Sequence, residues 1–132
     1  MIAPAIHYPG TCAEAIAFYQ TVFPVTDVHV EYYRDAPPDP GFPVTEENRD
    51  LVMHAEMTIS GSRVNMSDSG DAIVAGNMIV FNVFLDSGDA VSHAFRELNK
   101  GGKVIVELGP QFFSPMYGSV EDRFGVRWQL IS

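Results

Sequence analysis

The residues best suited to chemistry lie close together in an alternating stretch of the chain. In the run Leu51–Ser60, the polar residues His54 and Glu56 alternate with the apolar residues Ala55 and Met57. Because strand side chains point alternately to opposite faces, the two polar side chains share one face. This leaves three interpretations open: a hydrogen-bonded structural pair, a ligand-orienting pair, or a general base at Glu56 with a pKa raised by apolar surroundings.

Three further side chains are candidates for contact with a ligand. Asn82 lies in the otherwise apolar run Met78–Leu85, and a buried amide without a partner is costly. We therefore expect Asn82 either to pair with Gln129 across a sheet or to contact a ligand. Tyr117 and Trp128 could stack on a planar ligand, although aromatic side chains more often pack in a core.

The first half of the chain supplies the elements that must position His54 and Glu56. Thr11 and Glu14 form a capping-box pattern that predicts the start of a helix. Apolar residues recur there at helical spacing and should face a core: Cys12, Ala15, Ile16, Tyr19 and Phe23. Cys12 is also at the helix start, where a thiolate is favoured, but its place in this stripe favours packing. Strands are predicted at Ile2–Tyr8, Thr26–Arg34, Leu51–Ser60 and Arg63–Ser67.

Within the third of these strands, alternation predicts that one face holds Leu51, Met53, Ala55, Met57 and Ile59. Between the second and third strands, Asp35–Asp50 contains four prolines and is predicted to be an irregular loop. It could cover a pocket, contact a partner subunit or simply lie in solvent.

The second half of the chain repeats this order. Met78–Leu85 is apolar at nearly every position and is predicted to be a strand buried on both faces. A helix is expected to begin near Ser87 and to end at Gly101-Gly102. Further strands are predicted at Lys103–Leu108, around Met116–Glu121 and at Val126–Ile131.

The repeated order defines the expected fold class. Val28–Tyr32 of the first half corresponds to Val104–Leu108 of the second. We expect an α+β protein with two tandem β-α-β-β-β modules, residues 1–69 and 76–132, within one domain spanning residues 1–132. The two curved mixed sheets should surround a central cavity, with the helices on the outside.

Composition excludes several classes of function. The 132 residues are 46% hydrophobic, which is sufficient for a core, and contain no apolar run long enough to cross a membrane. The formal net charge is −9, with only 8 Lys and Arg residues, which argues against nucleic acid as a partner. A single cysteine and no recognisable signal peptide predict a cytoplasmic protein.

The chain resembles the vicinal oxygen chelate superfamily, which includes glyoxalase I, bleomycin-resistance proteins and extradiol dioxygenases, and within it the PhnB-like branch. The resemblance spans nearly the whole chain. The segments that carry it are Ala13–Tyr19 with Val22-Phe23, His54–Glu56, Ile59–Gly61, Met66–Asp68, Leu98 with Gly101-Gly102, Tyr117–Asp122 and Phe124–Gln129. Many relatives carry a ubiquinone-pathway methyltransferase label, but this sequence has no strand-then-glycine-loop pattern for a nucleotide-like cofactor.

The resemblance also implies a metal site. Metal-dependent members bind zinc, nickel, iron or manganese through His and Glu side chains from about four strands. The matching positions are His7 on the first predicted strand, His54 or Glu56 on the third, and Gln129 on the last. On the strand that begins the second half, the matching region is Val80 to Asn82. Gln129 replaces the usual Glu, and the side chain of Val80 cannot bind a metal. We therefore expect either a metal site of His7, Glu56 and Gln129 that lacks part of the family's usual ligands, or no metal at all.

Two functions follow from the resemblance and the residues. The first is an enzyme, of lyase, isomerase or dioxygenase type, that acts on a small oxygen-rich or carbonyl substrate through Glu56 and His54. The alternative is a non-catalytic protein that binds a small molecule through Asn82, Tyr117, Trp128 and Gln129. A homodimer is implied in either case, because members of the superfamily are usually dimeric.

Overall fold

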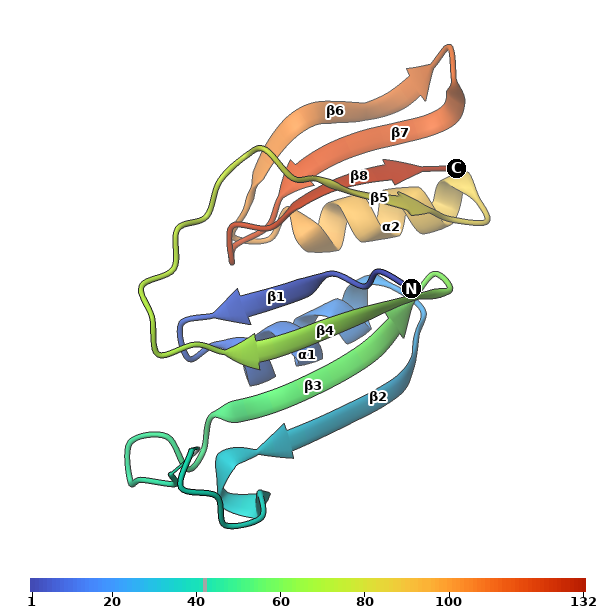
Figure 1. The fold of residues 1–132 in the computed structure, drawn as a ribbon. Helices are drawn as coiled ribbons and strands as arrows, with labels where there is room; N and C mark the ends of the chain where they lie inside the picture. Colours follow the sequence, from blue (N-terminus) through green and yellow to red (C-terminus); the bar gives the residue numbers. More distant parts are fainter. Residues whose placement is uncertain (42) are drawn as a thin grey trace. The chain divides into compact units, whose positions relative to one another are not determined.

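Figure 1 shows the computed structural model of the chain, which describes residues 1–41 and 43–132. In these residues the elements follow the order that the sequence predicts. The first half contains β1 (Ala5–Tyr8), α1 (Cys12–Val22), β2 (Val25–Tyr32), the short 3-10 helix η1 (Tyr33–Asp35), β3 (Val52–Ile59) and β4 (Ser62–Asp68). The second half contains β5 (Phe81–Phe84), α2 (Gly88–Leu98), β6 (Lys103–Gln111), β7 (Ser114–Glu121) and β8 (Arg127–Ile131).

The two sheets have the same strand order and the same strand directions. One sheet has the order β1-β4-β3-β2 and the other the order β5-β8-β7-β6. In each, the first two strands are parallel and the remaining neighbours are antiparallel. This confirms the predicted α+β fold with two repeated β-α-β-β-β modules.

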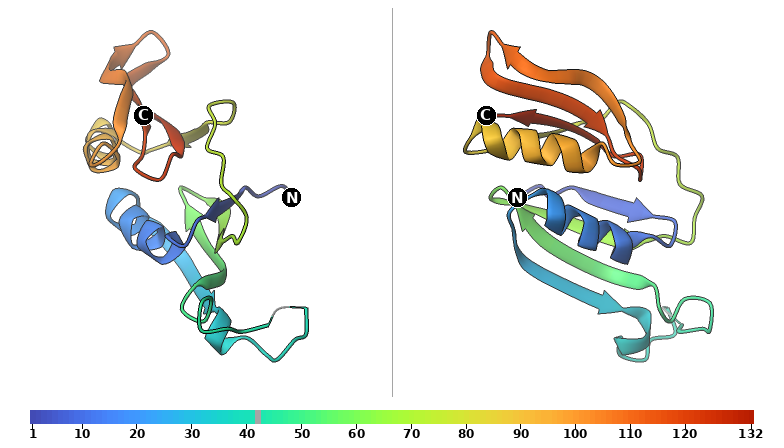
Figure 2. Two further views of the ribbon diagram at one scale, coloured as in Figure 1. Left: turned by 90° about the vertical axis from the view of Figure 1, so that its left-hand side faces the viewer. Right: turned by 180° about the vertical axis from the view of Figure 1, so that it is seen from behind.

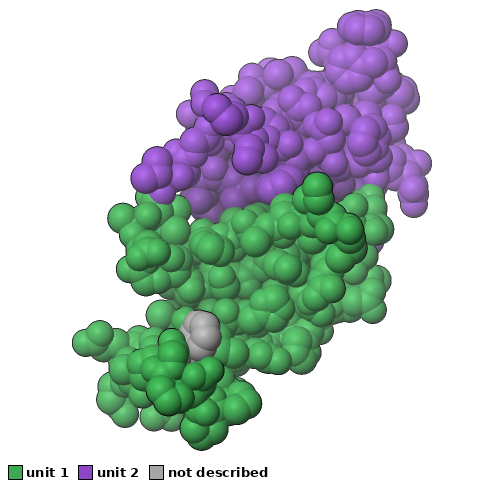
Figure 3. Space-filling model, viewed as in Figure 1, with its two compact units in different colours: residues 1–18, 25–73 green, residues 19–24, 74–132 purple. Residues whose placement is uncertain are grey.

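The chain divides into two compact units, which Figure 3 distinguishes by colour. The first unit holds residues 1–18 and 25–73, and the second holds residues 19–24 and 74–132. In the described part of the chain, neither helix combines the length and the hydrophobicity that a bilayer crossing requires.

A helix covers one face of each sheet (Figures 1 and 2). All five residues of the predicted apolar stripe in the first helix are buried. The second helix begins where the Ser87 side chain accepts a hydrogen bond from the amide of Ala90, which satisfies one of the free amides of its first turn. Its buried side is made of Val91, Ala94, Phe95 and Leu98.

The buried side chain of Cys12 is part of the core of the first unit. Its exposed fraction is 0%. Burial, and secondarily the negative charge of Asp68, raises the pKa of the Cys12 thiol to about 12. The neutral thiol is therefore the stable form at physiological pH, and packing outweighs the thiolate-favouring position at the start of α1.

The predicted faces of β3 are correct at one end only. Ala55, Met57 and Ile59 are buried as expected, but at the other end Val52 is buried and Met53 is not. The cause is a β-bulge, because Glu31 pairs with His54 whereas the next residue of β2 pairs with Val52. The extra residue reverses the alternation, so the apolar prediction for Met53 was wrong.

The prediction that Met78–Leu85 is buried on both faces was also wrong. Only four of its residues form β5, which pairs with β8 alone and is an edge strand of its sheet. Val83 is 5% exposed, whereas Met78 and Phe84 are 93% and 66% exposed. An edge strand with one helix-covered face buries only alternate residues, and the hydrophobicity of the run does not reveal this.

Candidate functional site

The face of the first sheet that α1 leaves uncovered carries several polar side chains from neighbouring strands. The strand register places Glu56 beside Asn65 of β4 and beside His29 of β2. The same register pairs His54 with Glu31. Residues that pair across neighbouring strands share a face, so the predicted pair His54 and Glu56 lies on this open face, as the alternation predicts.

Glu56 is the centre of a small charged cluster on this face. Its Oε2 atom forms an ion pair with the guanidinium of Arg63 and lies 3.7 Å from Nε2 of His54. The exposed fractions of the three side chains are 28% for Glu56, 43% for His54 and 45% for Arg63. The Nε atom of Arg63 also donates to Oδ1 of Asn65, at 3.3 Å. The carboxylate is therefore oriented by two cationic or hydrogen-bonding neighbours and still accessible to a ligand.

A hollow of about 210 Å³ lies directly beside this cluster. It is lined by Asp27, Glu56, Met57, Thr58 and Arg63. Asp27 has a φ of 53°, a left-handed conformation that is uncommon for a residue other than glycine. It lies where the register of β2 against β3 shifts, and bulges of this kind re-aim side chains near functional sites. The hollow is smaller than the pockets that hold drug-sized ligands, so it suits a ligand of a few heavy atoms.

The residues that the resemblance implies as metal ligands belong to both units. His7 lies on the open face of the first sheet, where it pairs with Ser67 of β4, so that β4 separates its strand from the strand of Glu56. Gln129 belongs to the second unit and pairs with Asn82. Amide and hydroxyl oxygens carry no charge, whereas zinc, nickel, iron and manganese prefer imidazole, thiolate or carboxylate donors. Of the three residues, only Gln129 offers an uncharged amide donor, and the metal site that the resemblance implies stays a prediction. Within residues 1–41 and 43–132, moreover, no three His, Cys, Asp or Glu side chains are arranged so that they could hold a metal ion.

The four predicted ligand-binding residues are divided between two faces of the second sheet. Asn82 and Gln129 are register neighbours on the face that α2 leaves open. Asn82 is exposed, so the burial that would have made a partner necessary is absent, and a hydrogen bond between the two amides stays a prediction. Tyr117 pairs with Ile131, two residues beyond Gln129, and therefore shares that face, but its side chain is only 8% exposed. Trp128 points to the opposite face and is only 2% exposed.

The contacts of Trp128 are those of a core residue. Its Nε1 atom donates to Oδ2 of Asp122 at 2.9 Å. Its ring lies 5.3 Å from the ring of Tyr19 and 5.2 Å from that of Phe23, centroid to centroid. Trp128 therefore offers a ligand almost no surface, and the packing interpretation that the sequence left open describes it better.

The sequence reasoning missed Arg63, Asp27 and the two side chains of β2 that face the cluster. His29 and Glu31 alternate on their strand just as His54 and Glu56 do. That repeated His-x-Glu spacing was the available signal. Arg63 could have been found from the tight hairpin at Gly61, which folds β4 back beside Glu56.

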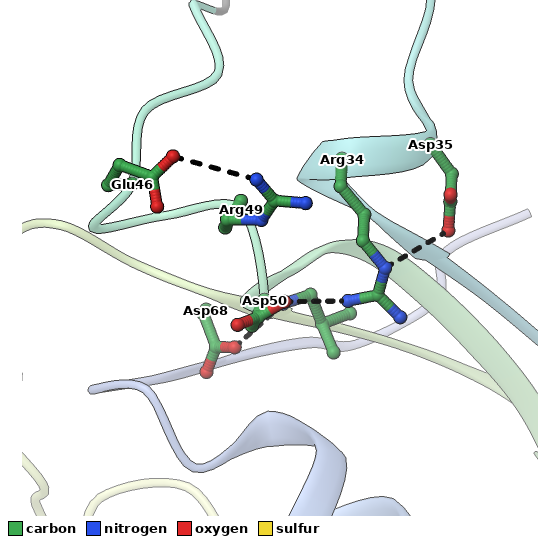
Figure 4. A network of polar contacts seen from close by, with 7 residues as sticks. Arg34, Asp35, Glu46, Arg49, Asp50 and Asp68 are labelled. Carbon is green, nitrogen blue, oxygen red and sulfur yellow. Dashed lines mark hydrogen bonds and ion pairs between the residues drawn. The ribbon is translucent and has the colours of Figure 1, made fainter.

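Two arginine side chains form ion pairs with carboxylates at the base of the Asp35–Asp50 loop (Figure 4). Arg34 forms ion pairs with Asp50 at 3.1 Å and with Asp35 at 3.9 Å. Arg49 pairs with Glu46 at 3.6 Å. These contacts are exposed, so they orient the loop more than they stabilise it.

Comparison with known proteins gives consistent matches along the whole chain. Residues 1–131 match the sequence profile of the family described as 3-demethylubiquinone-9 3-methyltransferase. The protein YjdN of Escherichia coli strain K12 is 28% identical over 145 residues, which cover 98% of this chain and 92% of YjdN.

Solved structures show the same fold. The protein PA1353 from Pseudomonas aeruginosa superposes with a TM-score of 0.80 at 26% identity, over 99% of this chain and 96% of that one. The PhnB protein from Bacillus cereus gives a TM-score of 0.75 at 24% identity, over 98% and 97%. The fosfomycin resistance protein FosX from Listeria monocytogenes, in a complex with Mn(II) and 1S,2S-dihydroxypropylphosphonic acid, gives 0.66 at 12% identity, over 99% and 90%. At that identity the likeness to FosX concerns the fold alone.

Proposed function

Because the chain belongs to the PhnB-like branch of the vicinal oxygen chelate superfamily, the family described as 3-demethylubiquinone-9 3-methyltransferase, we propose that it is an enzyme acting on a small oxygen-rich or carbonyl substrate. The open face of the first sheet binds this substrate, at the hollow beside Glu56 and Arg63. The observation that carries the proposal is an accessible carboxylate held between an imidazole and a guanidinium on an uncovered face.

Each side chain of the cluster has a role in this proposal. Glu56 acts as the general base that removes a proton from carbon next to a carbonyl group. His54, 3.7 Å from Glu56, is close enough to exchange a proton with the carboxylate through a small movement. Arg63 holds Glu56 in place, and its remaining N–H groups can donate to the oxygen atoms of a substrate.

The methyl-transfer activity in the family description is outside this proposal. A nucleotide-like methyl donor calls for a glycine-rich loop between a strand and a helix. Between β1 and α1 the chain has only one glycine, Gly10, and between β5 and α2 it has the sequence Leu85-Asp86-Ser87. The homodimer, which the resemblance implies, and the cytoplasmic location, which the composition predicts, stay predictions.

Replacement of Glu56 by Gln tests the proposal in an assay that needs no knowledge of the natural substrate. In D₂O, a general base exchanges the protons next to the carbonyl of hydroxyacetone, dihydroxyacetone or pyruvate, and NMR measures the loss of their signals. We expect metal-free wild-type protein to accelerate exchange of at least one compound, and Glu56→Gln to slow it by about 100-fold or more, since an amide cannot accept the proton.

The matched control is Glu107→Gln, which changes an exposed carboxylate on β6 of the second unit and should leave the rate unchanged. Equal rates in the wild type and Glu56→Gln would contradict the role of Glu56. If the wild type accelerates none of the three compounds, the enzyme proposal fails for this substrate class.

That last outcome would favour the second candidate, a non-catalytic protein that binds a small planar molecule. The observation behind this candidate is the open face of the second sheet. It carries the uncharged amides of Asn82 and Gln129 and the ring of Tyr117, which lies 5.0 Å from the ring of Phe113, centroid to centroid. The two amides can hydrogen-bond a ligand. Tyr117 is 8% exposed, so stacking would need its ring to move outward. Of the charged groups of this face, Glu121 and Arg127 are paired with each other.

A further inference from the structure

Half of the cationic side chains of this acidic chain lie at one end of the second unit. The chain has a formal net charge of −9 and only eight Lys and Arg residues. Four of the eight lie in the segments 100–103 and 121–127, together with only two acidic residues. The two segments are neighbours, because Lys103 of β6 pairs with Glu121 of β7. This end of the second unit is therefore positively charged, although the chain as a whole is negative.

A hollow of about 430 Å³ lies where these two segments meet. It is lined by residues 101–103 and 121–125, and its volume is within the usual range for small-molecule sites. A Cβ at position 101 would lie 3.2 Å from the Cβ of Arg123, so glycine at this position leaves room for the arginine. Two of the cationic side chains, Lys103 and Arg123, belong to the lining.

We propose that this hollow is a binding site for a phosphate group, either as the free ion or as the ester of a small molecule, held by Lys103 and Arg123. An ammonium group binds phosphate as a point charge, and a guanidinium group binds it with two parallel N–H groups. Lys103 is 62% exposed, and its Nζ atom is 3.8 Å from Oε2 of Glu121, which is too far for a hydrogen bond. The guanidinium of Arg123 lies over the ring of Phe124, 5.1 Å from its centroid. Stacking occupies the face of a guanidinium, whereas an anion binds at its edge.

The two carboxylates beside the hollow are engaged by other groups. Glu121 accepts a hydrogen bond from Nε of Arg127 at 3.1 Å, in addition to its longer contact with Lys103. Asp122 is 3% exposed, and its two oxygen atoms accept four hydrogen bonds inside the unit. The three cations Lys103, Arg123 and Arg127 therefore outnumber the two carboxylates, and a positive charge remains for a ligand.

The C-terminus of α2, just before Gly101, opposes an anion in the hollow. A helix dipole is equivalent to about half a negative charge at this end, and its effect falls off within the last turn. Lys103 and Arg123 each carry a whole positive charge, so their combined attraction exceeds this repulsion. Because salt screens exposed charges, binding should be strongest at low ionic strength.

This site goes beyond the proposed function, since it lies wholly in the second unit and uses no side chain of the cluster around Glu56. The test is a titration of ¹⁵N-labelled protein, followed by amide chemical shifts, at low and constant ionic strength. Inorganic phosphate is the first probe and glycerol 3-phosphate the second. Binding of both indicates a site for phosphate esters, whereas binding of inorganic phosphate alone indicates a site for the free ion.

For the wild type we expect saturable shifts in residues 101–103 and 121–125, with a Kd for phosphate of about 1 mM or below. Lys103→Gln and Arg123→Gln should each weaken binding by about tenfold or more, because each removes a charge-assisted hydrogen bond to the anion. Acetate should bind more weakly than phosphate by about fivefold or more, since it carries only one charge.

Two further variants separate the hollow from the overall charge of the protein. Glu121→Gln should strengthen phosphate binding a few-fold, because it removes a carboxylate next to Lys103. Arg49→Gln removes a positive charge from the first unit and should leave the affinity unchanged. Thermal unfolding of each variant establishes that the fold is intact.

The proposal is overturned if about 10 mM phosphate produces no localised shifts in the wild type, or if Lys103→Gln and Arg123→Gln both bind phosphate as the wild type does. Equal affinities for acetate and phosphate, or an equal loss in Arg49→Gln and Lys103→Gln, would also contradict it. None of these outcomes bears on the exchange assay for Glu56. Failure of that assay likewise leaves the phosphate titration unaffected, so the two proposals stand or fall separately.

Discussion

The Asp122→Ala variant is expected to lose about 3–5 kcal/mol of unfolding free energy, the largest effect that we anticipate for a single polar substitution in this chain. Asp122 is 3% exposed and accepts four hydrogen bonds within the second unit. Its Oδ1 atom accepts from the amides of Phe124 and Val126, at 2.9 and 3.0 Å. Its Oδ2 atom accepts from Tyr19 Oη at 2.6 Å and from Trp128 Nε1 at 2.9 Å.

The size of the effect follows from the donors that the variant leaves behind. Each hydrogen bond to a charged group contributes about 1.5–3 kcal/mol, and a buried donor without an acceptor carries its own penalty. Asp122 also holds the turn before β8, where Gly125 has a φ of 89°. The variant therefore loosens both the turn and the aromatic packing around Trp128.

Urea denaturation followed by fluorescence measures this loss directly, because Trp128 is the single tryptophan of the chain. The matched control is Asp86→Ala, an exposed aspartate of the same unit, which should change the free energy by no more than about 0.5 kcal/mol. A loss below about 1 kcal/mol in Asp122→Ala would contradict this account of the aspartate.

The second large effect is expected for Gly102→Ala. An added Cβ at this position would overlap the carbonyl oxygen of Glu121 and lie 2.9 Å from that of Leu98. Both obstacles are backbone atoms, so no side-chain rotation relieves the clash. We expect a loss of about 3 kcal/mol or more in unfolding free energy, at or above the upper end of the range for overpacking.

Gly109→Ala is the control for this prediction. Gly109 lies on β6 of the same unit, and a Cβ there would meet no atom within 4 Å. The same urea titration should show a change of no more than about 1 kcal/mol for this variant. Similar stabilities of Gly102→Ala and Gly109→Ala would show that the close approach of the chain at Gly102 has been misjudged.

The neighbouring glycines show how far a sequence pattern can be taken. The Gly101-Gly102 pair correctly predicts the end of the second helix. The structure then separates two reasons for it: Gly101 has a φ of 76°, which favours glycine, whereas Gly102 leaves room for a crossing strand. Spacing alone cannot distinguish a conformational requirement from a steric one, because the latter depends on residues about 20 positions away.

The fold could be predicted from the sequence because its signals are local and occur twice. Helix caps, breaking glycines and apolar periodicity predict β-α-β-β-β in each half. The burial of particular residues depends instead on pairing between strands that are distant in the sequence. The bulge at Met53 arises from the pairing with β2, and the exposure of Met78 and Phe84 arises from the edge position of β5.

In the candidate site, too, local patterns in the sequence predict some features, whereas others depend on how distant strands pair. Alternation within one strand correctly placed His54 and Glu56 on a common face. It also separates Trp128 from Gln129, since adjacent strand residues point to opposite faces, so a single ligand cannot contact both from one side of the sheet. Arg63, His29 and Glu31 joined the site only through strand register, which the sequence does not specify.

The central claim is that the open face of the first sheet binds a small oxygen-rich ligand. Amide chemical shifts of ¹⁵N-labelled, metal-free protein, recorded during a titration with pyruvate, test it most directly. We predict that the largest changes occur in residues 54–58 and 63–67, around Glu56 and Arg63. Changes confined to the second unit, or no changes at millimolar pyruvate, would contradict the claim.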